Sequence, residues 1–192
     1  MSNVRSPKTN TMARTALLII DIQRGAFDGI RCGPIDGPEI LVNNALSLLN
    51  AARESGAPIV LIQHCDAKGK VFEEGSVHWE LHEALAPQHG ETVLQKYESS
   101  AFEGTNLAGM LEGMNANELV LCGLQSEHCV SNTAKAALSK GFAVTIAQDG
   151  HSTWPSAGRS ANEIKEQVNH ELTHAGAGLS SVSSLVASLR AA

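Results

Sequence analysis

The chain has 192 residues, a size typical of one globular domain that can bury a hydrophobic core. Its net charge of −6 argues against nucleic acid or an anionic membrane surface as a partner, because both require a concentrated basic surface. With no apolar run near the length of a membrane span and no apolar stretch at the N-terminus, we expect neither a membrane segment nor a signal peptide.

Residues 1–13 are polar and show no periodicity, which predicts a flexible N-terminal tail before a single domain at 14–192. From there, short apolar runs alternate with amphipathic stretches. This alternation predicts an α/β fold, a three-layer doubly wound sheet of about six mainly parallel strands with helices on both faces. We expect strands near 15–20, 58–63, 92–96, 118–122, 142–147 and 178–182, and helices near 38–55, 105–113, 128–140, 160–175 and 183–190.

The first predicted strand ends in the motif LLIIDIQ, which contains Asp21. Its unbroken apolar run is typical of a strand buried on both faces of a parallel sheet. An acid at the carboxyl end of such a strand lies on the edge where open α/β sheets bind ligands. Asp21 is also consistent with a turn-capping residue, although a buried carboxylate is costly unless it is paired.

His64 directly follows the second predicted strand and therefore lies on the same edge as Asp21. We regard it as a candidate for a substrate contact or a metal ligand. The stretch from His64 to Gly90 is the longest without a predicted strand, and long excursions of this kind often form lids or partner contacts. His78 and His82 are four residues apart, but their sequence differs from the zinc-binding His-Glu-x-x-His pattern, so we predict no metal site there.

Lys96 lies at the end of the third predicted strand, in the motif LQKYESSAF. A lysine at a strand end is often only a solvated surface charge. Next to Asp21, however, an ammonium group would hold the carboxylate ionised and in place.

Cys129 lies in the motif LCGLQSEHCV, where an apolar strand breaks at Gly123 and a helical pattern begins. A thiol at a helix N-terminus is expected to favour the thiolate, the nucleophilic form. Alternatively, Cys129 is a small buried hydrophobic side chain with no chemical role. The other cysteines, Cys32, Cys65 and Cys122, show no paired spacing, which predicts free thiols in a reducing, cytoplasmic environment.

An acid, a lysine and a cysteine at three strand ends form a set that suits nucleophilic catalysis. The motifs LLIIDIQ, LQKYESSAF and LCGLQSEHCV resemble, in order and separation, the signatures of the isochorismatase-like cysteine hydrolases, which include nicotinamidase and N-carbamoylsarcosine amidase. The resemblance implies Cys129 as nucleophile, Asp21 as base and Lys96 as the third catalytic residue. It also implies a homodimer or homotetramer.

Further expectations follow from the resemblance. We expect an oxyanion hole formed by the backbone N–H groups of Gln125 and Cys129, next to a non-proline cis peptide at Leu124–Gln125. Some relatives bind a metal through an Asp-x-His pattern after the second strand, and that spacing is missing after Gln63. We therefore predict no metal and no cofactor.

The predicted reaction is hydrolysis of a small linear or cyclic amide or ureido compound through a thioester, with release of ammonia or an amine. The sequence does not name the substrate, and the residues we expect to contact it are Phe27, His64, Trp79, Gln125 and Trp154. Alternatives are the ether hydrolysis of true isochorismatases, in which the cysteine is typically absent, and a non-catalytic or redox-sensing member of the fold.

Overall fold

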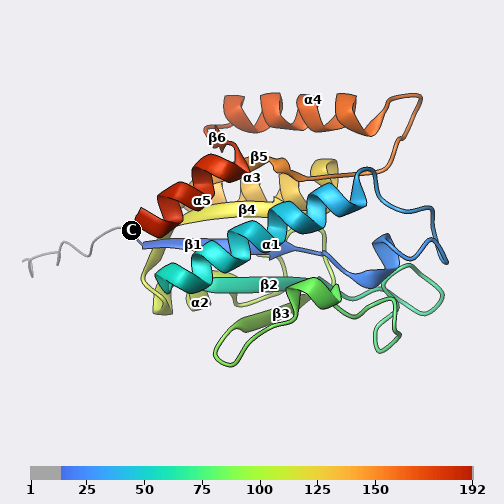
Figure 1. Cartoon of the computed structure of the whole chain (residues 1–192), viewed down its shortest axis with the longest axis horizontal. Coiled ribbons are helices and arrows are strands. Elements are labelled where there is room, and N and C mark those ends of the chain that lie inside the picture. Colours follow the sequence, from blue (N-terminus) through green and yellow to red (C-terminus); the bar gives the residue numbers. More distant parts are fainter. Residues whose placement is uncertain (1–13, 192) are drawn as a thin grey trace, which may run out of the picture.

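The computed structural model describes residues 14–191, so the predicted tail at 1–13 lies outside the described residues. Six parallel strands form one sheet in the order β3-β2-β1-β4-β5-β6 (Figure 1). The strands are β1 (Arg14–Ile20), β2 (Ile59–His64), β3 (Thr92–Lys96), β4 (Ala116–Gly123), β5 (Ala143–His151) and β6 (Gly178–Ser180). The predicted α/β class and the parallel sheet are confirmed.

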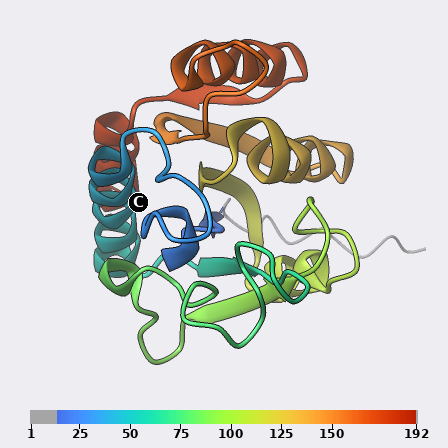
Figure 2. The ribbon, with the colours of Figure 1, turned by 90° about the vertical axis from the view of Figure 1, so that its right-hand side faces the viewer.

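Helices cover both faces of the sheet. Figure 2 shows α1 and α5 stacked on one side, while α2, α3 and α4 lie on the other side. The helices are α1 (Pro38–Ser55), α2 (Leu107–Gly113), α3 (Ser131–Ser139), α4 (Ala161–His174) and α5 (Val182–Ala191). Short helical turns are η1 (Arg24–Ala26), η2 (Glu83–Leu85) and the π-helical η3 (Ser126–Val130). None of the helices in the described part of the chain is long and apolar enough to cross a membrane.

The central strand β1 explains the three layers. Its side chains alternate between the two faces, so Leu17 and Ile19 join the core under α1, whereas Leu18 and Ile20 join the core under α2, α3 and α4. All four are at most 2% exposed. An unbroken apolar run is therefore required here, because each face of the strand is buried.

Strands β1 and β4 are in tight contact at their carboxyl ends. Ile20 pairs with Gly123, and the Leu124 N–H donates to the Ile20 carbonyl at 2.8 Å. Gly123 has φ +123°, and a Cβ atom built there would lie 2.0 Å from the Ile20 oxygen. The next residue of β1, Asp21, also adopts a left-handed conformation, with φ +53°. Glycine is thus required where β4 turns into η3.

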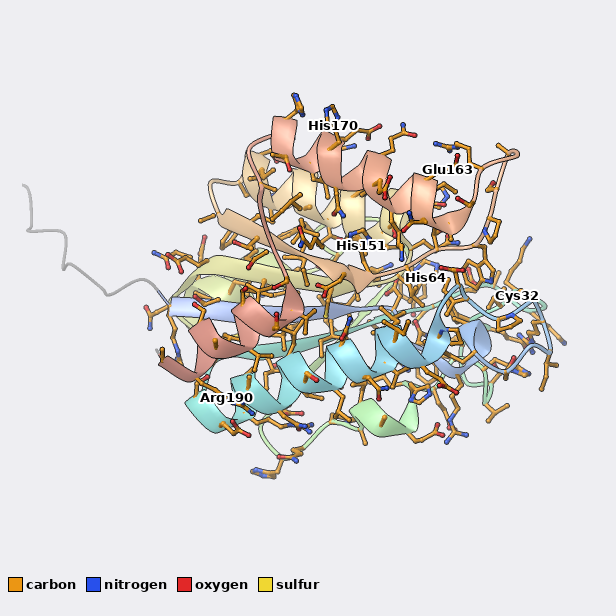
Figure 3. The ribbon with its side chains drawn as sticks, turned by 45° about the horizontal axis from the view of Figure 1, so that its top comes forward. Cys32, His64, His151, Glu163, His170 and Arg190 are labelled. Atoms are coloured by element: carbon orange, nitrogen blue, oxygen red, sulfur yellow. The ribbon has the colours of Figure 1, made fainter. Side chains whose placement is uncertain are left out.

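A buried hydrogen-bonded chain ties η3 to β5 and α4. The Asn169 amide donates to the Gln148 carbonyl (3.2 Å), so its Oδ1 faces His151 Nε2 (2.9 Å) and accepts that proton. His151 Nδ1 then accepts from the Ser126 hydroxyl (2.7 Å). His151, labelled in Figure 3, is 1% exposed, and burial lowers its pKa to about 4.

Replacing Gly123 by alanine should strongly destabilise the fold. The added Cβ would clash with the Ile20 backbone in a conformation that alanine avoids, so we expect a loss of about 3 kcal/mol or more in the free energy of unfolding. Urea denaturation of Gly123→Ala measures it. Gly113→Ala is the control, because a Cβ there meets nothing within 4 Å, and we expect a change below about 1 kcal/mol. Equal effects of the two substitutions would contradict the proposed constraint.

Acid should destabilise the protein through His151. The folded protein keeps this imidazole neutral down to about pH 4, whereas the unfolded chain takes up a proton near 6.5. The contribution to stability is therefore complete above the unfolded pKa and is lost as the pH falls toward 4, by up to about 3 kcal/mol. The stability advantage of the wild type over His151→Gln should shrink between about pH 7 and about pH 4.5 in urea denaturation.

The exposed His89 supplies the control for this measurement. His89→Gln removes an imidazole from the exposed surface and therefore controls for the loss of a histidine as such. An advantage of the wild type over His151→Gln that is the same at both pH values would contradict the prediction.

Candidate active site

The three predicted catalytic side chains meet at the carboxyl edge of the sheet. Asp21 follows β1, Lys96 is the last residue of β3, and Cys129 lies in η3 after β4. Lys96 Nζ lies 2.8 Å from Asp21 Oδ2 and 3.2 Å from Cys129 Sγ. Asp21 and Lys96 are almost fully buried, at 1% and 0% exposure. The lysine is therefore not a surface charge but the link between the acid and the thiol.

The charge states of Asp21 and Lys96 follow from their burial and from their contact with each other. Burial disfavours the Lys96 ammonium, but the Asp21 carboxylate and the contact with the Cys129 sulfur outweigh it and raise the lysine pKa above its ordinary value. Burial also raises the pKa of the Asp21 carboxyl, although the Lys96 charge opposes this. Asp21 Oδ1 has no hydrogen-bond partner among residues 14–191. Asp21 therefore has an oxygen free to accept a proton.

The expectation of a resting thiolate at Cys129 is wrong. Burial, followed by the nearby Asp21 charge, raises the pKa of the thiol to about 12. These effects exceed the opposing effect of the Lys96 ammonium, because removing a thiolate from water is costly. Cys129 is thus a thiol at rest and needs a base to become a nucleophile.

Lys96 also orients His64, the residue paired with it between β2 and β3. Lys96 Nζ lies 3.0 Å from His64 Nδ1, and an ammonium group can only donate, so Nδ1 accepts. Nε2 of the neutral ring then carries the proton and faces Asp66 Oδ1 at 3.3 Å. The Lys96 ammonium further donates to the Glu98 carbonyl at 3.2 Å.

Gln23 is a buried part of the site that our sequence analysis did not identify. Its side-chain amide donates to the carbonyls of His64 (2.9 Å) and Trp79 (2.7 Å) and accepts from the His64 N–H (2.8 Å). It thereby fixes the end of β2 against the loop that follows. The available signal was its place in the motif LLIIDIQ, two residues after Asp21.

A cavity of about 390 Å³ opens above these residues, and Asp21, Cys129, His64, Gln125 and Trp154 line it. Three of the five predicted substrate contacts, His64, Gln125 and Trp154, are therefore at the cavity wall. Figure 3 shows His64 at the end of the molecule where the strands terminate.

The other two predicted contacts do not line this cavity. Phe27 packs edge-on against His82 with 5.0 Å between ring centroids. Trp79 points its indole N–H at Cys65 Sγ, at 3.3 Å. Both lie in irregular segments, where sequence position does not determine side-chain direction.

The remaining lining residues are Cys32, Asp66, Val71, Phe72 and Leu124. The sequence analysis placed only Leu124 at the site, through the peptide bond to Gln125, and did not identify the other four. Three of them belong to the excursion after β2, which folds back over the strand ends. Asp66 had a detectable signal, because it follows His64 by two residues on the same edge.

The predicted cis peptide at Leu124–Gln125 is wrong, since no peptide bond is cis within residues 14–191. The turn out of β4 is made instead by the positive φ of Gly123, with Leu124 hydrogen-bonded to Ile20. The cis geometry was our reason for expecting the Gln125 N–H in the oxyanion hole. That reason no longer holds, and an oxyanion contact from the Cys129 N–H stays a prediction.

Metal-binding groups do not gather in this part of the chain. Across residues 14–191, no three His, Cys, Asp or Glu side chains are grouped so that they would hold a metal ion.

Comparisons with known proteins agree with this architecture. A streptothricin hydrolase from Streptomyces noursei is 35% identical over 139 residues, which cover 72% of this chain and only 50% of that protein. A maleamate amidohydrolase from Pseudomonas putida is 31% identical over 157 residues, 71% of each chain. The crystal structure of an isochorismatase from Pseudomonas putida superposes with a TM-score of 0.81 at 29% identity and covers 89% of each chain. A family model for the isochorismatase domain matches residues 15–182, and the chain therefore belongs to the isochorismatase family.

Proposed function

We propose that this isochorismatase-family hydrolase cleaves a carbon–nitrogen bond of a small amide or ureido compound, with Cys129 as the nucleophile. The observation that carries the proposal is the position of Lys96 Nζ, which contacts both Asp21 and Cys129 at the floor of a cavity. Relatives named as amidohydrolases support the same chemistry. An acid, a fixed cation and a thiol in contact are the groups that acyl transfer requires.

In the first half of the reaction, Asp21 takes the thiol proton while the Cys129 sulfur attacks the substrate carbonyl. A carbon–sulfur bond forms, and the carbonyl oxygen becomes an oxyanion. The Cys129 N–H donates to this oxygen, and the Lys96 charge lowers the energy of the developing negative charge. Cleavage of the carbon–nitrogen bond then releases ammonia or an amine, which takes the proton from Asp21.

In the second half, water hydrolyses the thioester. Asp21 takes a proton from the attacking water, and the carbon–sulfur bond breaks to release a carboxylic acid. The same proton returns to the Cys129 sulfur, which restores the thiol. Lys96 keeps Asp21 ionised between these transfers, because the two groups form a buried pair.

Cys129→Ala should abolish turnover without unfolding the protein. The substitution removes the nucleophile and only one sulfur atom at a cavity wall, so we expect a loss of at least about a thousandfold in kcat and little change in stability. Ammonia release from a panel of nicotinamide, carbamoylated amines, biuret and ureido acids measures the rate. Mass spectrometry of the wild type should detect an acyl group on Cys129.

Cys65→Ser is the matched control, because this buried cysteine lies outside the cavity lining and its hydroxyl can still accept from Trp79. It should retain turnover. Alkylation of the wild type with iodoacetamide should also abolish activity. Continued hydrolysis after complete alkylation of Cys129 would favour the cysteine-independent ether hydrolysis of isochorismatases over our proposal.

The pH profile should report the base rather than the thiol. The rate falls in acid as Asp21 becomes protonated, with a midpoint above the ordinary carboxyl value because burial raises the Asp21 pKa. Above that limb we expect a plateau through neutral pH, since the thiol pKa of about 12 and the raised Lys96 pKa place their deprotonation in alkali. A kcat/KM that rises tenfold per pH unit through the neutral range would instead indicate a thiolate formed by hydroxide.

A further inference from the structure

One carboxylate in the candidate active-site cavity, that of Asp66, faces no lysine or arginine side chain within residues 14–191. Two acids line this cavity, and Asp21 is neutralised by Lys96 at 2.8 Å. The only ionisable side chain that the Asp66 carboxylate faces within residues 14–191 is an imidazole, through the 3.3 Å approach of His64 Nε2. Because the Lys96 ammonium occupies Nδ1 of that ring, His64 faces Asp66 as a neutral donor. The lining therefore contains one carboxylate, Asp66, that no ammonium or guanidinium group within residues 14–191 neutralises.

Asp66 is held in a fixed position at the cavity wall. Its Oδ2 accepts from the Phe72 N–H at 3.0 Å, and its own N–H donates to the Phe72 carbonyl at 2.8 Å. The side chain remains 28% exposed, in contrast to the buried Asp21. A ligand in the cavity can therefore reach the carboxylate without breaking the Asp21–Lys96 pair.

The walls beside Asp66 suit an organic cation. Phe72 and Trp154 are aromatic, and aromatic faces attract positive charge. Trp154 is fixed by its indole N–H, which donates to the Gly33 carbonyl at 2.6 Å. Val71 and Leu124 add apolar surface, which strengthens an ionic contact by excluding water. The net charge of −6 of the whole chain acts in the same direction.

We propose that the substrate carries a positively charged group, an ammonium or a guanidinium, that binds Asp66 between Phe72 and Trp154 while its amide carbonyl lies at Cys129. This inference rests on the proposed function and names the substrate class of the same site. An amide that bears a carboxylate would meet Asp66 without a compensating cation, because Lys96 already pairs with Asp21. Such compounds are poor substrates.

Charged thiol reagents test this directly and do not require the natural substrate. Aminoethyl, methyl and sulfonatoethyl methanethiosulfonate carry a positive, a neutral and a negative group. In each reaction the Cys129 sulfur attacks the sulfenyl sulfur, a mixed disulfide forms, methanesulfinate leaves, and Asp21 takes the thiol proton. Rates at Cys129 are followed by peptide mass spectrometry, separately from Cys32 in the same cavity, and are divided by the rates for mercaptoethanol.

We expect the positive reagent to modify Cys129 at least about tenfold faster than the negative one after this correction. Asp66→Asn should reduce the ratio about tenfold, and Asp66→Glu, which retains the charge, should keep most of it. Glu112→Gln removes one negative charge from the exposed surface of α2, outside the cavity, and should leave the ratio unchanged. Circular dichroism checks that the variants are folded.

The outcomes separate this inference from the proposed function. Modification of Cys129 by the neutral reagent, with no preference for the positive one or with a preference that Asp66→Asn does not change, overturns the substrate class and leaves the nucleophile in place. A Cys129 that does not react even with the neutral reagent overturns the nucleophile and the inference together. A preference that Glu112→Gln lowers as much as Asp66→Asn overturns the role of Asp66.

Discussion

The contact between Lys96 and Asp21 is the constraint on which the rest of the site depends. Both groups are taken out of water, and a buried ion pair tolerates the loss of one member poorly, typically at about 3–5 kcal/mol. The chain must therefore deliver both charges to one point. That requirement fixes the ends of β1 and β3, and it draws in His64 from β2 and Cys129 from η3, since both contact the same ammonium group.

Parallel topology makes this convergence possible. Neighbouring parallel strands all end on one edge, so residues far apart in the sequence reach a common point there. The close approach of these strand ends still requires unusual backbone conformations. Asp21 adopts a left-handed conformation, and Gly123 accepts a positive φ against the Ile20 carbonyl. Strain of this kind concentrates beside active sites because the surrounding sheet holds it in place.

The parts of this arrangement that were predictable are those governed by local pattern. Apolar runs and their breaks located the six strands, and the acid, lysine and thiol at or after three strand ends indicated which side chains meet at the carboxyl edge. Side-chain directions in irregular segments were not predictable, which is why Trp79 turned out to bind Cys65 while Phe72 and Asp66 line the cavity. The raised pKa of Cys129 depends on burial, a property of the folded chain rather than of its helical turn. The expected dimer or tetramer stays a prediction.

The protonation state of Cys129 also bears on a role as a redox sensor. Sensor cysteines react with oxidants as exposed thiolates, whereas a thiol with a pKa of about 12 is almost entirely protonated at neutral pH. In the proposed mechanism its reactivity depends on Asp21, which accepts the proton as the sulfur forms a bond to an electrophile held in the cavity. A low thiol pKa would make the sulfur reactive toward both bound carbonyls and oxidants in solution. The buried Lys96–Asp21 pair separates these two properties. Under the proposed mechanism, the pair permits attack on a bound carbonyl while the sulfur rests as a thiol between turnovers, which suits a hydrolase better than a sensor.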